Sequence, residues 1–403
     1  MPPLLLDRDS LLPRPQPRPP DPGFVDFGRH QPDARALDRF GIEEALRLGV
    51  LPLRSAGAVT PVAARSRDAF RRALPVLERM LGPVAWCRTT PRQVESHIAA
   101  IRDQALAARA THRTATRESC RDWSGRRAAC WATAALFAAL SVAFLWRGLV
   151  MGAVTAWAAL TLVAVTGLRT AAAAVEFNRA RKLGHQWASH RPALGAAGAQ
   201  PFISLLVPLF HEKDIARRLV DRLGRLSYPR DRMEVLLILE AEDTATITAL
   251  NQATLPAWMR IIQVPPGAPR TKPRAMNYAL DFAKGDIIGI YDAEDKPAPD
   301  QLIKVTQTFR TSGPETACVQ GVLDFYNARQ TWLTRCFTID YATWFRLVLP
   351  GLVRLGFVIP LGGTTVFFRR EALEKLGRWD AHNVTEDADL GIRLARRLSR
   401  GIR

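Results

Sequence analysis

Cysteine is scarce in this sequence, and the five cysteines form no metal or redox motif. None belongs to a Cys-x-x-Cys pair, none has a histidine at zinc spacing beside it, and their number is odd. This spacing argues against a structural zinc site and against a disulfide framework. We interpret the five as reduced cytosolic or buried thiols: Cys87, Cys120, Cys130, Cys318 and Cys336.

The first residues also lack a secretory signal, because no basic segment precedes a cleavable apolar stretch. We expect the N-terminus to stay in the cytosol.

Acidic residues are few, with 38 Asp and Glu against 56 Lys and Arg, and the formal net charge is +18. Such a charge suits an anionic partner, which could be nucleic acid, a phospholipid surface or a phosphorylated substrate. With 403 residues, the chain is long enough for two or three domains.

The N-terminal part divides into a tail and a small domain. Residues 1–33 are rich in proline and arginine and cannot bury enough apolar surface to offset ordering, so they predict a disordered tail. Residues 34–110 alternate short helical periods with a strand at Val59 to Ala63, which predicts a small α/β domain. The pattern there contains no convergent polar cluster, so we expect a docking module or a ligand-binding regulator.

Two uncharged apolar runs are the clearest feature of the chain. Ala128 to Trp146 and Gly148 to Gly167 are 19 and 20 residues long, and only Arg147 separates them. At a rise of about 1.5 Å per residue, each run spans roughly 29 Å, which matches the hydrocarbon core of a bilayer. Residues 128–167 therefore predict a transmembrane helical hairpin, and the alternative is one long buried helix.

Basic residues flank this hairpin on both sides, in a juxtamembrane segment at 111–127 and in a linker at 168–200. The positive-inside rule then predicts a multi-pass protein of the inner (plasma) membrane, with the N-terminal and C-terminal domains both cytoplasmic. Anionic lipid would account for much of the net charge, so the lipid bilayer is an expected partner and nucleic acid is not.

Residues 201–403 alternate strand-length apolar runs with amphipathic helical periods, which predicts an α/β domain around a parallel sheet. Ligands of such sheets bind outside the carboxyl ends of the strands. We expect the first strand to end before Pro208 and helices to lie between the later strands. The expected strands are Ile203 to Val207, Val235 to Leu239, Ile261 to Val264, Asp286 to Tyr291 and Ala317 to Val322.

Three acidic clusters fall at or near strand ends. Glu240 to Asp243 follows the second strand and could contact a nucleotide or cap a loop. Asp292 to Asp295 places three acids in four residues, a crowding that a hard divalent cation would relieve, although an acidic turn has the same pattern. Thr385 to Asp389 opens a helix, where the pattern fits catalysis and helix capping equally well.

Together these segments resemble the family 2 glycosyltransferases, the superfamily of cellulose synthase and related polysaccharide synthases, over residues 201–403. The resemblance implies a Rossmann-like fold of the nucleotide-diphospho-sugar transferase type. It also implies inverting transfer of a sugar from a nucleotide-diphosphate sugar to a glycan acceptor, in polysaccharide or exopolysaccharide synthesis. The matching segments are PLFHEKDIARRLVDRLGRLSYPRDRMEVLLILEAED, TKPRAMNYAL, YDAED, PLGGTTVFFRREAL and NVTEDADLGIRLARR.

The resemblance further implies roles for individual residues. Asp387 would be the general base. Mg²⁺ or Mn²⁺ would be held by Asp292 and Glu294, and the acceptor side would include Gly362, Gly363 and Glu386. Glu240 and Glu294 stand where this family usually has aspartate. Donor-binding roles would fall to Glu240, Asp243, Lys272 and Asn277.

The N-terminal domain resembles that of type II secretion ATPases over the segments RFGIEEALRLGVLPL, VTPVAARSRD and LERMLGPVAWCRTTPRQVESHI. Some of these relatives bind a cyclic dinucleotide, so that ligand or other export subunits are the partners this resemblance suggests. A catalytically silent membrane-bound nucleotide sensor, or a docking subunit of a polysaccharide secretion system, is the alternative function. Nucleotidyl transfer would use the metal-binding acids but gives no role to Asp387.

Two further features concern the acceptor. Trp332 to Pro360 mixes apolar and aromatic residues with spaced arginines, which fits helices at a membrane interface or an ordinary core helix pair. Relatives that make polymers continue past the Thr-Glu-Asp helix to a Gln-x-x-Arg-Trp motif and further transmembrane helices, whereas this chain stops at Arg403. We therefore expect a domain truncated at its C-terminus, as a fragment or as a shortened gene product, which leaves polymer retention and export open.

Overall fold

A computed structural model describes residues 23–55, 57–183, 200–212 and 216–397. The chain divides into two compact units, Met1–Arg102 and Asp103–Arg403. Helix α4 (Pro91–His112) passes from one unit into the other, and its backbone is non-helical at Arg102. The part of the predicted tail at 1–22 and the part of the predicted linker at 184–199 lie outside the described residues.

The first unit contains a three-stranded sheet in the order β1-β2-β3. Residues 23–33, which we expected to belong to the disordered tail, instead contact this unit: the Val25 N–H donates to the Arg88 carbonyl, and Phe27 stacks on His97. The elements are β1 (Val50–Pro52), β2 (Thr60–Ala64), β3 (Val84–Arg88), α1 (Ala34–Phe40), α2 (Ile42–Leu48) and α3 (Arg67–Leu81).

Helices α5 (Gly125–Leu145) and α6 (Arg147–Leu183) carry the two apolar runs. Both are long and apolar enough to cross a membrane, and their most apolar windows are 0% buried. In the described residues the two runs thus form two separate helices that are exposed over their most apolar windows. Helix α6 continues past Gly167 into the segment predicted as a linker, because alanine and arginine, both strong helix formers, are frequent there.

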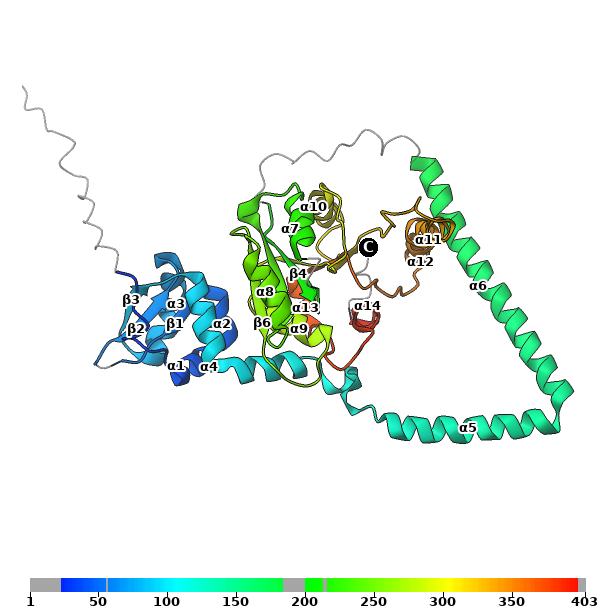
Figure 1. The fold of residues 1–403 in the computed structure, drawn as a ribbon, viewed down its shortest axis with the longest axis horizontal. Coiled ribbons are helices and arrows are strands. Elements are labelled where there is room, and N and C mark those ends of the chain that lie inside the picture. The colour runs from blue at the N-terminus through cyan, green and yellow to red at the C-terminus, as the bar shows by residue number, and fades with distance from the viewer. Residues whose placement is uncertain (1–22, 56, 184–199, 213–215, 398–403) are drawn as a thin grey trace, which may run out of the picture. The chain divides into compact units, whose positions relative to one another are not determined.

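The second unit is built on a six-stranded sheet in the order β6-β5-β4-β7-β9-β8. Strands β4 and β6 of this sheet are labelled in Figure 1. The four strands from β6 to β7 run parallel, as expected for an α/β domain, whereas β9 is antiparallel to both β7 and β8. The strands are β4 (Ile203–Leu209), β5 (Met233–Glu240), β6 (Met259–Val264), β7 (Ile287–Ile290), β8 (Cys318–Gln320) and β9 (Val366–Arg369).

Two strands differ from the sequence prediction. Strand β4 runs through Pro208 to Leu209, because its pairing with β7 ends at Leu206 and only β5 accompanies it further. The missing N–H of Pro208 therefore falls where one side of the strand is already unpaired. Strand β9 lies inside the segment that we assigned to the acceptor-side loop, and its short apolar run gave no separate signal.

Helices cover both faces of this sheet, so all eight residues of β5 are buried. This double burial explains why its apolar run is continuous rather than alternating. Helix α9 (Lys272–Leu280) lies on one face. The opposite face packs against α7 (Ala216–Gly224), α8 (Thr244–Gln252) and α10 (Gln301–Thr311).

Among the remaining elements, helix α12 packs against the long helix α6. Helix α12 (Leu349–Arg354) lies so close to α6 that a Cβ on Gly351 would be 2.0 Å from the Ala172 carbonyl oxygen. Arg354 Nε also donates to Glu176 Oε2 at 2.6 Å. The other elements are α11 (Trp332–Thr343), the π-helix η5 (Trp344–Val348), α13 (Arg370–Lys375) and α14 (Glu386–Arg397).

Candidate active site

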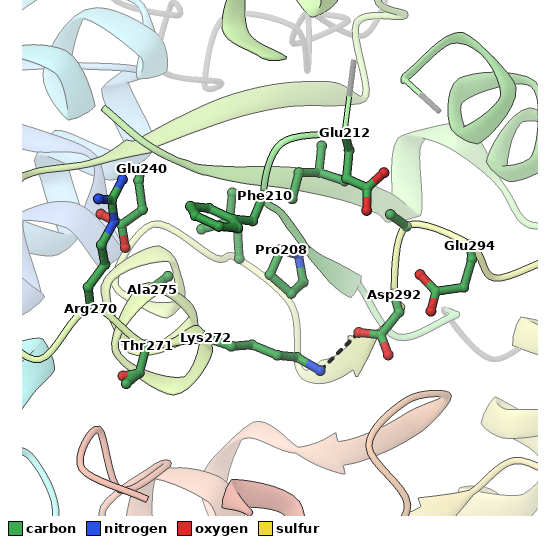
Figure 2. Close-up of a pocket in the computed structure, with 13 residues that line it drawn as sticks. Pro208, Phe210, Glu212, Glu240, Arg270, Thr271, Lys272, Ala275, Asp292 and Glu294 are labelled. Atoms are coloured by element: carbon green, nitrogen blue, oxygen red, sulfur yellow. Dashed lines mark hydrogen bonds and ion pairs between the residues drawn. The ribbon is translucent and has the colours of Figure 1, made fainter. Parts of the chain in front are cut away.

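A cleft of about 360 Å³ opens at the carboxyl ends of β4, β5 and β7 (Figure 2). This is the edge of the sheet at which ligands of such folds bind. Four of the residues singled out from the sequence line the cleft together: Glu240, Lys272, Asp292 and Glu294. They come from the end of β5, the start of α9 and the loop after β7, so the topology of the sheet brings them together.

Lys272 connects the cleft to the helix that carries Asp387. Its Nζ lies 2.9 Å from Asp292 Oδ1 and 3.7 Å from Glu386 Oε1, and it donates to the Gly363 carbonyl at 3.1 Å. The contact with Asp292 is visible in Figure 2. Burial alone would lower the pKa of Lys272, but Asp292, Asp387 and Glu386 raise it above its usual value. The ammonium is therefore charged at neutral pH.

Asp387 lies in the first turn of α14 and is 6% exposed. Its Oδ2 is 3.5 Å from the position that a Cβ on Gly363 would take, so the acceptor-side loop passes directly over it. Its Oδ1 has no hydrogen-bond partner among the described residues. Burial and the neighbouring Glu386 raise the pKa of Asp387 to about 7, against the lowering effect of Lys272. This carboxylate can take up a proton near neutral pH.

Asp295, the last acid of its cluster, has a structural role. Its Oδ2 accepts hydrogen bonds from the Asp292 N–H at 3.0 Å and from the Thr364 hydroxyl. The Asp292 N–H also donates to Thr364 Oγ1 at 3.1 Å. Burial raises the pKa of Asp295 despite these bonds. Asp295 and Thr364 thus fix the loop that presents Asp292 to the cleft.

Two carboxylates, Asp292 and Glu294, are available in the cleft for a metal ion. No group of three or more His, Cys, Asp or Glu side chains that could hold a metal occurs in the described part of the chain. A donor set of two hard oxygen ligands fits Mg²⁺ or Mn²⁺, which bind one or two carboxylates and complete their coordination with water and phosphate oxygens.

The other end of the cleft combines an acid with basic and aromatic side chains. Glu240 is 8% exposed, and burial raises its pKa while Arg274 and Arg270 oppose the shift. Arg270 also forms an ion pair with Glu242 at 2.9 Å and lies over the ring of Phe210 at 5.5 Å. Sequence reasoning missed both residues, although Phe210 lies within the segment PLFHEKD and Arg270 directly precedes TKPRAMNYAL.

Two predicted donor-binding residues do not line the cleft. Asp243 caps α8, where it accepts hydrogen bonds from the N–H groups of Thr246 and His211. Burial acts to raise the pKa of Asp243, but these hydrogen bonds lower it overall. Asn277 is 0% exposed, and its amide is bonded to backbone groups of Ala110 and Trp379. The positions of both residues fit structural roles rather than the predicted contact with a donor.

The chain is similar in sequence to known glycosyltransferases. A family model described as "Glycosyltransferase like family 2" matches residues 200–403. Probable glycosyltransferase YdaM of Bacillus subtilis (strain 168) is 28% identical over 197 residues, which are 48% of this chain and 46% of the relative. Beta-monoglucosyldiacylglycerol synthase of Trichormus variabilis is 27% identical over 261 residues, which are 64% of this chain and 53% of the relative.

The chain thus spans about half the length of these curated relatives. Among solved structures, the mannosyltransferase PcManGT from Pyrobaculum calidifontis, in complex with GDP-Man and Mn²⁺, is similar at 22% sequence identity. That similarity covers 58% of this chain and 62% of the mannosyltransferase chain, with a TM-score of 0.41.

Proposed function

This chain belongs to glycosyltransferase family 2, and we propose that it transfers a sugar from a nucleotide-diphosphate sugar to a hydroxyl group at a membrane surface. One observation carries the proposal. The Lys272 ammonium lies between Asp292 and Glu386, so the cleft at the sheet edge and the buried Asp387 belong to one site. A sugar donor and an acceptor hydroxyl need such a site, in which a polar cleft adjoins a base.

The cleft supports donor binding through its charges. Asp292 and Glu294 would hold Mg²⁺ or Mn²⁺, which when bound would neutralise the diphosphate leaving group. Lys272 adds a cation fixed at 2.9 Å from Asp292. A fixed cation there stabilises negative charge that develops on the phosphates. Glu240, at the other end of the cleft, is positioned for the hydroxyl groups of a ribose or for a base edge.

Asp387 is the proposed general base. At neutral pH, a carboxylate with a pKa of about 7 can take the proton from the acceptor hydroxyl while that hydroxyl attacks the anomeric carbon. Gly362 and Gly363 form the acceptor side, and a side chain on Gly363 would contact Asp387. Glu386 belongs to the same side through its ion pair with Lys272. Single displacement by a base opposite the leaving group inverts the anomeric carbon.

Packing against α6 supports a place at the membrane surface. Gly351 of α12 touches Ala172 of α6. The apolar run ends at Gly167, and at a rise of about 1.5 Å per residue Ala172 lies about 8 Å further along the helix. That distance corresponds to the outer edge of the headgroup layer of a bilayer in which α5 and α6 form a transmembrane hairpin. Trp332 and Ile339 of α11 are 74% and 67% exposed, as expected for interfacial helices.

A hydroxyl acceptor at this depth belongs to a glycan or a lipid held at the inner membrane. Beta-monoglucosyldiacylglycerol synthase, the Trichormus relative, is named for a lipid product, which supports a lipid acceptor. The resemblance of the sequence motifs to polysaccharide synthases supports a glycan acceptor instead. Both units would then be cytoplasmic, as the basic flanks of the hairpin predict. We propose the first unit as a docking or regulatory module, with a cyclic dinucleotide or export subunits as candidate partners.

A catalytically silent nucleotide sensor is the competing function. Asp387 argues against it, because a buried carboxylate oxygen without a partner is costly and a sensor has no use for it. In an enzyme the same oxygen is the group that receives the proton.

The first experiment is an assay of the full chain in native membranes with UDP- and GDP-sugars, with and without Mg²⁺ or Mn²⁺. We expect transfer of one labelled sugar to membrane material and its loss on chelation of the metal. Asp292→Asn should lower transfer by about 100-fold or more, because it removes charge stabilisation of the leaving group. Donor binding without turnover in the unaltered chain would favour the sensor instead.

A further inference from the structure

A strained turn precedes the helix that carries Asp387. Gly377 has φ +79° and Arg378 has φ +62°, so two consecutive residues adopt the left-handed region. That conformation is unfavourable for arginine, and it persists only where the surroundings hold it. The turn runs from Gly377 to Asp380, and we refer to it as the Trp379 turn.

A segment outside the family-matched residues holds this turn. Thr114 Oγ1 lies 3.0 Å from the carbonyl oxygens of both Gly377 and Trp379 and donates its proton to them. The Asp380 carboxylate accepts from Ser119 Oγ at 2.8 Å and from the Cys120 N–H at 2.7 Å. Thr114 and Asp380 are 2% and 1% exposed, so these bonds are shielded from water. We call residues 103–123 the brace.

The brace also reaches the helix that supplies Lys272. Asn277 of α9 donates to the Ala110 carbonyl of the brace at 2.9 Å and to the Trp379 carbonyl at 2.8 Å. Arg109 of the brace lies 3.8 Å from Asp281, which also accepts from Arg378 of the turn at 2.6 Å. One buried network therefore joins the brace, α9 and the Trp379 turn.

The Trp379 turn is bonded to the helix that carries the proposed base. The Trp379 side chain is 0% exposed, and Arg393 of α14 donates to the Arg378 carbonyl of the turn at 2.9 Å. Within the described residues, neither Trp379 Nε1 nor Asp387 Oδ1 has a hydrogen-bond partner of normal geometry. Buried polar atoms without partners are costly, so their presence on both sides of this connection calls for a functional explanation.

We propose that the brace positions Asp387 for deprotonation of the acceptor, with Thr114 and Ser119 acting as positioning residues through the Trp379 turn. This inference rests on the proposed function. The brace leads into α5 at Gly125, so the segment that enters the proposed membrane hairpin also sets the geometry of the base. The catalytic unit then extends beyond the family-matched residues 200–403.

The test compares Thr114→Val with Thr114→Ser in the full chain in native membranes, with the donor that the unaltered chain uses. Valine has nearly the shape of threonine but removes the hydroxyl, whereas serine keeps it. We expect Thr114→Val to lower kcat about five- to tenfold while the donor KM stays unchanged. The donor contacts at Asp292 and Lys272 are untouched, and Thr114→Ser should restore most of the rate.

A matched control is Thr111→Val, because Thr111 is also buried in the brace but its hydroxyl donates, among the residues the structure describes, to the Ala107 carbonyl of its own helix alone. We expect it to leave kcat and KM unchanged. Ser119→Ala is a second test variant, at a partly exposed position, in case Thr114→Val does not fold. It should lower kcat in the same way.

Several outcomes would overturn the inference. The first is an unchanged kcat in both Thr114→Val and Ser119→Ala. The second is a rise in the donor KM that accompanies the fall in kcat, and the third is a fall in kcat in Thr111→Val as large as that in Thr114→Val. If the unaltered chain transfers sugar and one of these occurs, only the inference fails. If the unaltered chain transfers no sugar from any donor, the proposed function fails and the inference fails with it.

Discussion

Asp295 is half-buried and Asp387 is buried at the same site, and desolvation raises the pKa of each carboxylate. They differ in their partners. Asp295 accepts from the Thr364 hydroxyl and the Asp292 N–H, whereas Asp387 Oδ1 accepts from no described group. An acid whose oxygens are hydrogen-bonded stabilises a loop, and a buried acid with an unpaired oxygen is ready to exchange a proton. The comparison therefore assigns structure to one acid and chemistry to the other.

The largest expected effect tests the second half of this comparison. Asp387→Asn keeps the size of the side chain but cannot accept the acceptor proton, so we expect sugar transfer to fall by about 10²- to 10⁴-fold. Donor binding should be retained, because Asp387 does not line the donor cleft. Initial rates of transfer and equilibrium binding of the nucleotide measure the two quantities separately.

Asp389→Asn is the matched control, since Asp389 lies in the same turn but pairs with Arg393 at 2.8 Å. It should retain most of the transfer rate. Unchanged transfer in Asp387→Asn would refute the assignment of the base.

The pH dependence of the rate follows from the raised pKa of Asp387. The base works only when deprotonated, so kcat/KM should rise about tenfold per pH unit below a pKa of about 7 and level off above it. A rate profile between pH 5 and 9 checks this. If the acid limb lies near the ordinary aspartate value of about 4, the buried carboxylate is not the base.

The same pKa predicts the sign of a stability effect. Folding raises the pKa of Asp387 above its unfolded value, so the folded chain binds this proton more tightly. The stability that results is complete below about pH 4 and is lost as the pH rises to about 7. Asp387→Asn should abolish this part of the pH dependence of thermal unfolding.

The sequence was sufficient to identify the cleft but not all of its residues. Strands β4, β5 and β7 end in acids or lead into them, and parallel topology brings those ends together, so Glu240, Asp292 and Glu294 meet as expected. Asp243 and Asn277 belong to the same motifs but face inward. A motif fixes the order of residues along the chain, and only the local hydrogen bonds decide which of them face the cleft.

The brace could not have been found from the sequence. Thr114, Ser119 and Asp380 are ordinary polar residues, and the first two lie more than two hundred and fifty positions from the turn they contact. Long-range side-chain contacts of this kind leave no periodic pattern. The short strand β9 was missed for a related reason, because a four-residue apolar run is too brief to separate a strand from a loop.

The smallest effect is expected from a substitution that removes a hydrogen bond from Asp295, so that this carboxylate, like Asp387, loses a partner. Thr364→Val removes the hydroxyl that donates to Asp295 and accepts from the Asp292 N–H, with little change in shape. We expect the free energy of unfolding to fall by about 1 kcal/mol at pH 8 and by less at pH 5, because the lost bond stabilises the charged form of Asp295. Transfer should fall less than tenfold. Thr364→Ser keeps the hydroxyl and should match the unaltered chain in thermal unfolding. If Thr364→Val is as stable as the unaltered chain at pH 8, the hydrogen bonds of Asp295 do not distinguish it from Asp387.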